Sequence, residues 1–339
     1  MVQGEFGMSK KKITAILLAA VIVLGSIAFS LYKYDRTKRF PYNEKNSFAM
    51  GTIVSQKAYA PYGAKHIEKV NLLISAVEDT ISRNIDSSAV SQLNSEGKTE
   101  NAEVAGILKR CEEISLLTDG AFDVTVGGVV DLWGFGEENE GIPEKTELEK
   151  AISEAGKDKL AIEGDKITLS SAAEVDLGAV GKGIACDTAI AYYKAVSDCN
   201  GAIVSVGGSI GCFGQYNKQG DRWRIAIRHP RQENSFLGVI SLDEGFVSTS
   251  GDYEKYFMEN DVRYHHILDA RTGYPASSGL ISVTVVCDSG FLSDALSTAC
   301  FILGREKSIS LLEKYDASAI FVDEEMEVTT VGEIDFERQ

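Results

Sequence analysis

The sequence predicts an α+β protein with mostly antiparallel sheets and packed helices, preceded by one transmembrane helix. Three observations support this prediction. Helical patterns, with apolar residues three and four positions apart, come early in the chain, and short strand-like segments dominate its second half. Helices and strands do not alternate regularly, which favours α+β over α/β. A chain of 339 residues with 44% hydrophobic residues can also bury a large core.

An uncharged segment near the N-terminus predicts the transmembrane helix. Residues 13–32 contain no charged side chain and follow three lysines, and a helix of this length spans the hydrocarbon core of a bilayer. The alternative is a cleaved secretory signal, but the apolar segment is long for one and no clean cleavage site follows it. We therefore expect a cytoplasmic N-terminus at residues 1–12, a signal anchor at 13–32, a linker at 33–46 and the folded domain at 47–339.

The charge distribution bears on partners and on orientation. Residues 1–45 carry eight basic and three acidic side chains, a net charge of +5. Because the whole chain has a net charge of −16, the remaining residues carry −21. Such an acidic domain argues against a nucleic-acid partner. Basic residues flank the apolar segment on both sides, which gives only a weak preference for a cytoplasmic N-terminus. On that preference we expect a single-pass protein of the cell membrane with an extracytoplasmic domain.

Local patterns predict the individual elements. Apolar residues recur three and four positions apart in three predicted helices, residues 63–83, 102–120 and 308–317. Apolar and β-branched residues, bounded by turn residues, mark five predicted strands, residues 202–208, 223–229, 238–242, 281–287 and 318–322.

The cysteines predict neither a zinc site nor an obvious disulfide framework. The six of them form no CxxC pair and have no histidine at metal-ligand spacing: Cys111, Cys186, Cys199, Cys212, Cys287 and Cys300. If the domain lies outside the cell, some pairing is possible. Scattered buried thiols are the favoured interpretation.

The segment VDLGAVGKGIACD, residues 175–187, places Asp176, Lys182 and Asp187 among small residues that allow a backbone to approach a ligand. It resembles a phosphate-binding loop but does not match GxxxxGK[ST], because Gly183 follows the lysine. Tight packing at the start of a helix explains the glycines equally well.

A second glycine-rich segment, SVGGSIGCFG at residues 205–214, follows a predicted strand. Gly208, Gly211 and Gly214 stand three apart and do not match the GxGxxG pattern of dinucleotide-binding folds. We therefore expect no nicotinamide cofactor here, although the segment could provide a backbone platform beside a ligand.

The segment FLSDALSTACFILG, residues 291–304, predicts a helix that Gly304 ends. Asp294, Ser297 and Thr298 fall at i, i+3 and i+4, so they share one face. A carboxylate and a hydroxyl placed in this way can bind Mg²⁺ together with water and substrate phosphate oxygens. The alternative is an ordinary solvated helix face.

The segment DGAFDVTVGGVVDLWGFG, residues 119–136, combines acidic and aromatic residues that could line a pocket for an aromatic ring. Core packing explains the aromatic residues equally well. The residues concerned are Asp119, Phe122, Asp123, Asp131, Trp133 and Phe135.

The segment YHHILDARTGYP, residues 264–275, alternates like a strand and then turns at Gly273 and Pro275. Alternation directs His265 and His266 to opposite faces, so we expect only one of them to reach a given site. Histidine suits general-base catalysis near neutral pH, although structural histidines are more common.

Taken together, these segments resemble the ApbE family, the FAD:protein FMN transferases, over nearly everything after residue 47. Eight motifs occur in the family's order: AMGTIVS, ISRNIDSSAVSQLN, TDGAFDVTVGGVVDLWGFG, VDLGAVGKGIACD, VSVGGSI, VSTSGDYEKYF, HHILDARTGYPA and SVTVVCDSGFLSDALSTACFILG. The resemblance implies a two-lobed, T-fold-like α+β domain with FAD between the lobes. It also implies Mg²⁺-dependent transfer of FMN from FAD to a Thr or Ser hydroxyl of an acceptor flavoprotein, with AMP leaving.

The resemblance also implies which residues form the site. Mg²⁺ would be held by Asp294, Thr298 and the backbone carbonyl of Ala179. The residues that fall where the family contacts FAD are Met50, Asn84, Ala121, Phe122, Asp123, Asp176, Lys182 and Leu268. Lys182 can add a second positive charge at the diphosphate, which an acidic protein would otherwise repel. His266 is our candidate to accept the hydroxyl proton, with Asp269 as the second choice.

Two positions depart from the family pattern. Ala270 stands where the family often has proline, and Asn84 stands where relatives often have an aromatic residue, so we expect weaker stacking on the flavin or adenine. Water could then compete with the acceptor hydroxyl, which leaves an Mg²⁺-dependent FAD pyrophosphatase as an alternative. A flavin-binding module without turnover is a further one, but it would not need a metal at the diphosphate. The expected acceptor belongs to a membrane or extracellular electron-transfer system.

Overall fold

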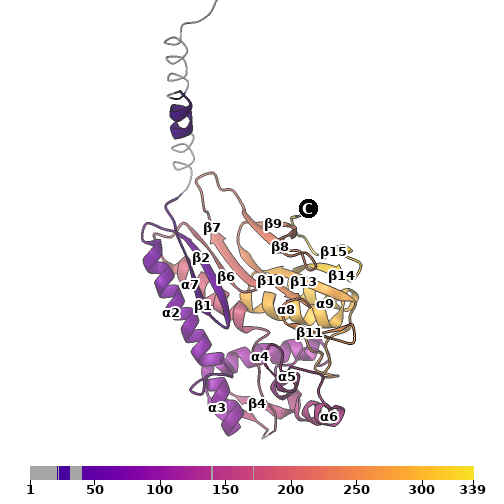
Figure 1. The fold of residues 1–339 in the computed structure, drawn as a ribbon. Helices are drawn as coiled ribbons and strands as arrows, with labels where there is room; N and C mark the ends of the chain where they lie inside the picture. The colour runs from indigo at the N-terminus through magenta and orange to yellow at the C-terminus, as the bar shows by residue number, and fades with distance from the viewer. Residues whose placement is uncertain (1–20, 22, 31–39, 139, 171) are drawn as a thin grey trace, which may run out of the picture.

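The structure, a computed structural model, describes residues 21, 23–30, 40–138, 140–170 and 172–339 (Figure 1). Residues 1–12, much of the predicted anchor at 13–32 and half of the predicted linker at 33–46 lie outside the described residues. No helix among those described is long and apolar enough to cross a membrane. The domain boundaries therefore stay a prediction.

An antiparallel sheet of eight strands forms the centre of the fold (Figure 1). Every pair of neighbouring strands in it is antiparallel. In spatial order the strands are β1 (Asn43–Ala49), β2 (Thr52–Tyr59), β6 (Gly201–Val206), β7 (Ser209–Gly214), β10 (Gly245–Gly251), β13 (Leu280–Cys287), β14 (Ser318–Asp323) and β15 (Val328–Val331). The central strand β13 is apolar along most of its length because both faces of the sheet are covered there.

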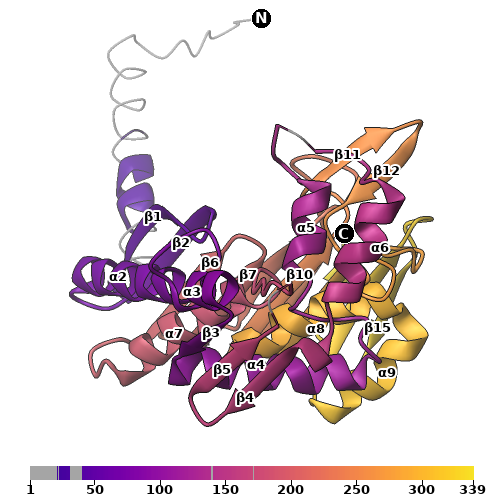
Figure 2. The same cartoon turned by 90° about the horizontal axis from the view of Figure 1, so that it is seen from below.

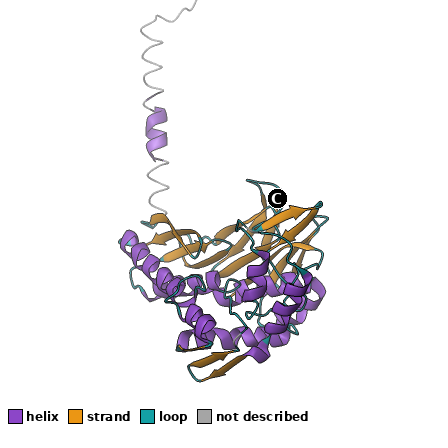
Figure 3. Cartoon of the chain, turned by 60° about the horizontal axis from the view of Figure 1, so that its bottom comes forward, coloured by secondary structure: helices purple, strands orange, loops and turns teal. Residues whose placement is uncertain are grey.

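Helices cover one face of this sheet (Figure 3). They are α2 (Gly63–Ile81), α7 (Gly181–Ala195), α8 (Gly290–Leu303) and α9 (Arg305–Lys314). Apolar side chains of α2 and α7, such as Ile74 and Ala189, pack with Val54 and Val204 of the sheet. Side chains of α8, such as Phe291, pack with those of the central strands. The apolar face of each helix is thus buried against the sheet.

A second, three-stranded sheet covers the opposite face, in the order β16 (Phe336–Arg338), β9 (Phe236–Leu242) and β8 (Trp223–Arg228). In β8, Trp223, Ile225 and Ile227 are buried and the residues between them are exposed. This alternation is typical of a strand with one solvated face. The buried side chains contact the large sheet at Val247 and Ile320.

The remaining elements lie below the helix layer in Figure 1, and Figure 2 shows the domain from their side. They are α3 (Ala89–Glu96), α4 (Ala102–Leu117), α5 (Gly127–Trp133), α6 (Lys145–Glu154), the 3₁₀ turn Lys157–Lys159, the sheet β3 (Lys98–Glu100), β5 (Lys166–Leu169), β4 (Leu160–Glu163), and the hairpin β11 (Tyr256–Glu259) with β12 (Val262–His265). Trp133, Leu148 and Leu268 form the core that joins α5, α6 and this hairpin.

The predicted α+β class with antiparallel sheets is confirmed, and each helix and strand predicted between residues 63 and 322 is present. The predicted transmembrane helix lies mostly outside the described residues. The sequence patterns do not predict the hairpin of β1 and β2, through which the chain enters the sheet before helix α2. Its first strand lies at the sheet edge with mostly exposed side chains, and therefore has no apolar alternation to detect. All six cysteines are free thiols, and five are buried.

Candidate functional site

Helices α7 and α8 approach so closely at their first turns that only glycine fits. A Cβ atom on Gly183 would lie 2.0 Å from the carbonyl oxygen of Gly290. A Cβ atom on Gly290 would lie 2.2 Å from the carbonyl oxygen of Gly183. Protein interiors are too closely packed to absorb such an overlap without movement. The tight helix packing considered for residues 175–187 is therefore present, and it places Lys182 beside α8.

Two carboxylates connect these helices reciprocally. Asp187 of α7 accepts hydrogen bonds from the backbone N–H groups of Gly290 (2.7 Å) and Phe291 (2.8 Å) at the start of α8. Asp294 of α8 accepts a hydrogen bond from the N–H of Gly183 (2.9 Å) in the first turn of α7. The first N–H groups of a helix have no acceptor within that helix. Here each helix supplies the other with a negatively charged acceptor for them.

Asp294 is buried, with 5% of its surface exposed, so the polar face of α8 is not the solvated face that was the alternative. Burial raises the pKa of Asp294, and the positive charge of Lys182 opposes this shift, together with hydrogen bonds from Gly183 and Ser209. The Ser209 hydroxyl donates to Oδ1 of Asp294 at 3.1 Å. An additional positive charge nearby would stabilise the ionised form of this buried carboxylate.

Thr298 lies one turn along α8 and faces strand β10. The Ser250 hydroxyl of β10 is 2.8 Å from Oγ of Ser297 and 3.2 Å from Oγ1 of Thr298. Thr298 and Ser250 are partly exposed, whereas Ser297 is fully buried. Ser250 was not among the predicted site residues, although its alternation with Ser248 in the segment VSTSG indicates a polar strand face.

A short loop, residues 176–180, leads into α7. Oδ1 of Asp176 accepts the N–H of Gly178 (2.6 Å), and Nζ of Lys182 donates to the carbonyl of the same glycine (3.2 Å). Ala179, between them, is partly exposed. Met50, in the turn between β1 and β2, lies against α7, because a Cβ on Gly181 would be 3.1 Å from its Cε. The loop and this turn therefore border the same region.

Arg83, which the sequence analysis did not single out, holds Asp176 from the other side. Its guanidinium lies 3.3 Å from Asp176, 2.6 Å from Asp131 and 2.8 Å from Glu174. Burial lowers the pKa of Arg83, but these three carboxylates together raise it above its ordinary value. The neighbouring Asn84 is exposed. One cation thus neutralises part of a cluster of acids behind the loop.

The adjacent histidines have different surroundings, as the alternation predicts. His265 is 7% exposed; its Nδ1 accepts the N–H of Ile267 (3.3 Å) and its Nε2 donates to the carbonyl of Ala276 (3.2 Å). His266 is partly exposed, and its Nδ1 donates to the carbonyl of Lys255 (3.3 Å), which leaves Nε2 as an acceptor. Burial, with the charge of Lys182, lowers the pKa of His266 to about 4. His266 is therefore neutral at physiological pH.

Asp269 begins the turn after these histidines, and its carboxylate is paired with Arg271. The guanidinium of Arg271 donates to Oδ2 at 2.6 Å and to Oδ1 at 2.9 Å. Leu268, before it, is 8% exposed and packs with Trp133 and Leu148. The N–H of Ala270 donates to the carbonyl of Ala121 (3.1 Å), so the turn is tied to residues 121–123.

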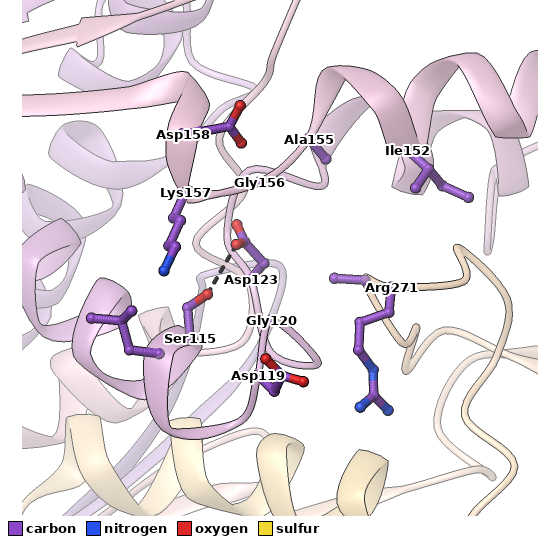
Figure 4. A pocket seen from close by; sticks show the side chains of 12 residues that line it. Ser115, Asp119, Gly120, Asp123, Ile152, Ala155, Gly156, Lys157, Asp158 and Arg271 are labelled. Carbon is purple, nitrogen blue, oxygen red and sulfur yellow. Dashed lines mark hydrogen bonds between the residues drawn. The ribbon is translucent and has the colours of Figure 1, made fainter.

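A cavity of ≈ 300 Å³ lies beside Asp123, between the end of α4, the segment after α6 and the turn at Ala270 and Arg271 (Figure 4). Asp123 accepts hydrogen bonds from the Ser115 hydroxyl (3.0 Å) and the Thr125 N–H (2.8 Å). Ala121 and Phe122 are 0% and 2% exposed, so of these three predicted residues Asp123 alone presents surface to a ligand. Phe122 packs in the core, which was the alternative interpretation of the aromatic residues in this segment.

The structure thus gathers one group of predicted residues around the first turn of α7. Lys182 acts electrostatically on both Asp294 and His266, although the three lie on different elements. Asp123 and Leu268 lie further out and connect to this group through the backbone. The N–H of Asp176 donates to the carbonyl of Val124 (2.7 Å). Such a group combines a cation, a buried carboxylate and a neutral imidazole, and charged groups held in fixed positions suit phosphoryl transfer.

Comparison with known proteins finds relatives over most of the chain. Residues 50–321 match the model of the ApbE family. The chain is 36% identical over 233 residues to the FAD:protein FMN transferase of Haemophilus influenzae, an alignment that covers 66% of each chain. It is 31% identical over 300 residues to the FAD:protein FMN transferase of Treponema pallidum, with 81% of this chain and 83% of that protein covered.

Solved structures have the same fold. The ApbE protein of Thermotoga maritima superposes with a TM-score of 0.79 at 31% identity, covering 86% of this chain and 97% of that one. The flavinyl transferase ApbE of Pseudomonas stutzeri, in its apo form, superposes with a TM-score of 0.75 at 29% identity, covering 87% and 95%. All the predicted site residues fall within the matched range of residues 50–321.

Proposed function

The chain belongs to the ApbE family, and from this premise we propose that it transfers FMN from FAD to a threonine or serine hydroxyl of an acceptor flavoprotein. The acceptor oxygen forms a bond to the phosphorus of the FMN moiety. The bond from that phosphorus to the AMP oxygen breaks, and AMP leaves with the electron pair. The observation that most supports the proposal is the first turn of α7, where the N–H of Gly183, next to Lys182, donates to the buried carboxylate of Asp294 at 2.9 Å.

A magnesium ion would be held by Asp294, Thr298 and the backbone carbonyl of Ala179. Within the described ranges there is no group of three or more His, Cys, Asp or Glu side chains that could hold a metal. The proposed set instead offers one carboxylate, one hydroxyl and one carbonyl. Mg²⁺ prefers oxygen ligands of this kind and completes its shell with water and substrate phosphate oxygens. When bound, it would neutralise charge on the diphosphate.

His266 is the proposed general base. Its Nδ1–H is bound to the carbonyl of Lys255, so Nε2 has a lone pair available for the hydroxyl proton. Asp269, the second choice, has both carboxylate oxygens engaged by Arg271. A base already paired with a guanidinium is a weak proton acceptor, because protonation would break the ion pair.

The remaining proposed contacts surround FAD between two lobes of the domain. Lys182 would bind the diphosphate, and the predicted residues that present surface would contact the nucleotide: Met50, Asn84, Asp123, Asp176 and Leu268. Ala121 and Phe122 are buried and would hold Asp123 in place from the core. Asp123 lines the cavity beside the turn, and Asp176 is held by Arg83 on the opposite side. These two carboxylates suit hydrogen-bond donors of the isoalloxazine, ribityl or adenosine groups.

We also propose that residues 13–32 anchor the enzyme in the cell membrane with the catalytic domain outside the cytoplasm. Support comes from the sequence, through the length and the lack of charge of that segment. The acceptor would then belong to a membrane or extracellular electron-transfer system. Protease accessibility of the domain in intact cells and spheroplasts tests this orientation, and protection in both would contradict it.

The central test incubates the full chain with FAD, Mg²⁺ and a candidate acceptor from the native membrane fraction. We expect flavin fluorescence on the acceptor in a denaturing gel, release of AMP and a threonine or serine that carries FMN by mass spectrometry. Free FMN and AMP without labelled acceptor would instead indicate an FAD pyrophosphatase. Unchanged FAD would indicate a flavin-binding module.

A further inference from the structure

A cluster of buried hydroxyl groups lies beside Asp294. Ser209 of β7, Ser248 of β10 and Ser293 of α8 are 1%, 0% and 0% exposed. Ser209 and Ser248 are direct partners in the register of these two strands. The helix residue Ser293 precedes Asp294 and faces the same strand. Three hydroxyls from three elements therefore converge on one side of the carboxylate.

The two hydrogen bonds that lead from Ser248 through Ser209 to Asp294 run in one direction. Ser248 donates to Oγ of Ser209 at 3.0 Å, and Ser209 donates to Oδ1 of Asp294 at 3.1 Å. Oγ of Ser293 lies 2.8 Å from that of Ser248 and also has the carbonyl of Gly290 as an acceptor at 2.9 Å. Each serine hydroxyl has one proton, so a Ser209 that accepts from Ser248 has its own proton free for the carboxylate. Such chains strengthen each member.

The two oxygens of Asp294 are bound from different elements. Oδ2 accepts the N–H of Gly183 in α7, and Oδ1 accepts the hydroxyl of Ser209 in β7. One donor on each oxygen fixes the plane of the carboxylate independently of its own helix. Donors of this kind also stabilise the ionised form, which is the form that binds a cation.

We propose that Ser209, supported by Ser248, is a positioning residue that orients Asp294 for a divalent cation. The inference rests on the proposed function, because it assigns Ser209 a role in the cation site of that reaction. Ser209 does not touch the cation; it acts through Asp294. Partners that orient metal ligands in this way typically change metal affinity about 10–100-fold when they are removed.

The test measures Mn²⁺ binding to the full chain by the electron paramagnetic resonance signal of free Mn²⁺, without FAD. Mn²⁺ is the probe because it shares the oxygen preference of Mg²⁺. We expect Ser209→Ala to weaken Mn²⁺ binding at least about tenfold. In transfer assays the same variant should need correspondingly more Mg²⁺ for half-maximal rate, with a smaller change in the KM for FAD.

Thr284→Val is the matched control. Thr284 is 1% exposed, and its hydroxyl pairs with that of Thr249 at 2.8 Å in the same sheet, but Thr249 points to the face opposite Ser248. The control removes a buried hydrogen bond of the same kind and should leave Mn²⁺ affinity unchanged. Equal Mn²⁺ affinity in Ser209→Ala and the wild type would overturn the role of Ser209.

A second variant covers the case in which Ser209→Ala does not fold. Ser248→Ala keeps the bond from Ser209 to Asp294 but removes the donor behind it, and we expect Mn²⁺ binding about twofold to fivefold weaker. Unchanged affinity there, with Ser209→Ala unfolded, would also overturn the inference. A wild type that binds no Mn²⁺ would overturn the cation site itself, a failure of the proposed function that is distinct from a failure of Ser209.

Discussion

Substitution of Gly183 by alanine should separate helices α7 and α8 and thereby disable the site. The new Cβ would lie 2.0 Å from the carbonyl oxygen of Gly290 and 2.7 Å from Cβ of Asp294. Carbon and oxygen atoms in close contact across an interface are normally at least about 3.3 Å apart. The helices must therefore move apart by roughly 1 Å. Neither clashing neighbour is the end of a flexible side chain, so a rotamer change cannot remove the overlap.

The expected effect has a structural and a catalytic part. Overpacking of this kind costs about 1–3 kcal/mol in the free energy of unfolding. The movement also lengthens the hydrogen bond from the Gly183 N–H to Asp294, now 2.9 Å. Misplacement of a catalytic group by about 1 Å can reduce the rate about 10²-fold. We therefore expect a fall of about two orders of magnitude in kcat/KM for flavin transfer.

Gly106→Ala is the matched control, because Gly106 lies in the middle of helix α4 and a Cβ atom there would meet no neighbouring atom within 4 Å. Alanine there should stabilise the helix by about 0.5–1 kcal/mol. Both variants are compared by urea unfolding and by the rate at which the acceptor becomes fluorescent. If Gly183→Ala equals Gly106→Ala in both measurements, the contact between the helices does not set the geometry of the site.

Three further predictions concern charge and metal. Because the pKa of His266 is lowered to about 4 from 6.5, its base form persists until the pH falls toward 4, so the acid limb of kcat/KM should lie near pH 4. Lys182→Met removes a positive charge that contributes to this shift and should move the limb to higher pH; an unchanged limb would exclude His266 as its source. Arg83→Met leaves Asp176 without its counter-charge and should raise the KM for FAD about tenfold with a smaller change in kcat, whereas a loss confined to kcat would contradict its placement behind the loop. Removal of divalent ions with EDTA should abolish transfer until Mg²⁺ is restored, and transfer that persists in EDTA would refute the cation site.

The parts of the fold that the sequence predicted are those with a strong local period. Helix α2 and strand β8 have clear apolar patterns because each is buried along one face. The edge strand β1 has no such face and escaped detection. For helix α8 the spacing placed Asp294 and Thr298 together correctly, but it could not tell a buried polar face from a solvated one. That distinction depends on the serines of β10, which no local pattern connects to α8.

The site is held together by contacts between residues far apart in the chain. These contacts fix its geometry, and they also make it difficult to predict from the sequence. A carboxylate can remain buried only when donors reach it, and here those donors come from residues far away in the chain. Gly183 and Ser209 are separated from Asp294 by 111 and 85 positions. In the sequence, this arrangement is visible only as one glycine on each side of the contact between α7 and α8. From the sequence alone, a ligand-binding loop explains the glycines before α7 equally well. Both explanations can hold. The close approach of the helices leaves no room for a side chain at Gly183, and the same approach brings the Gly183 N–H of α7 to the Asp294 carboxylate of α8.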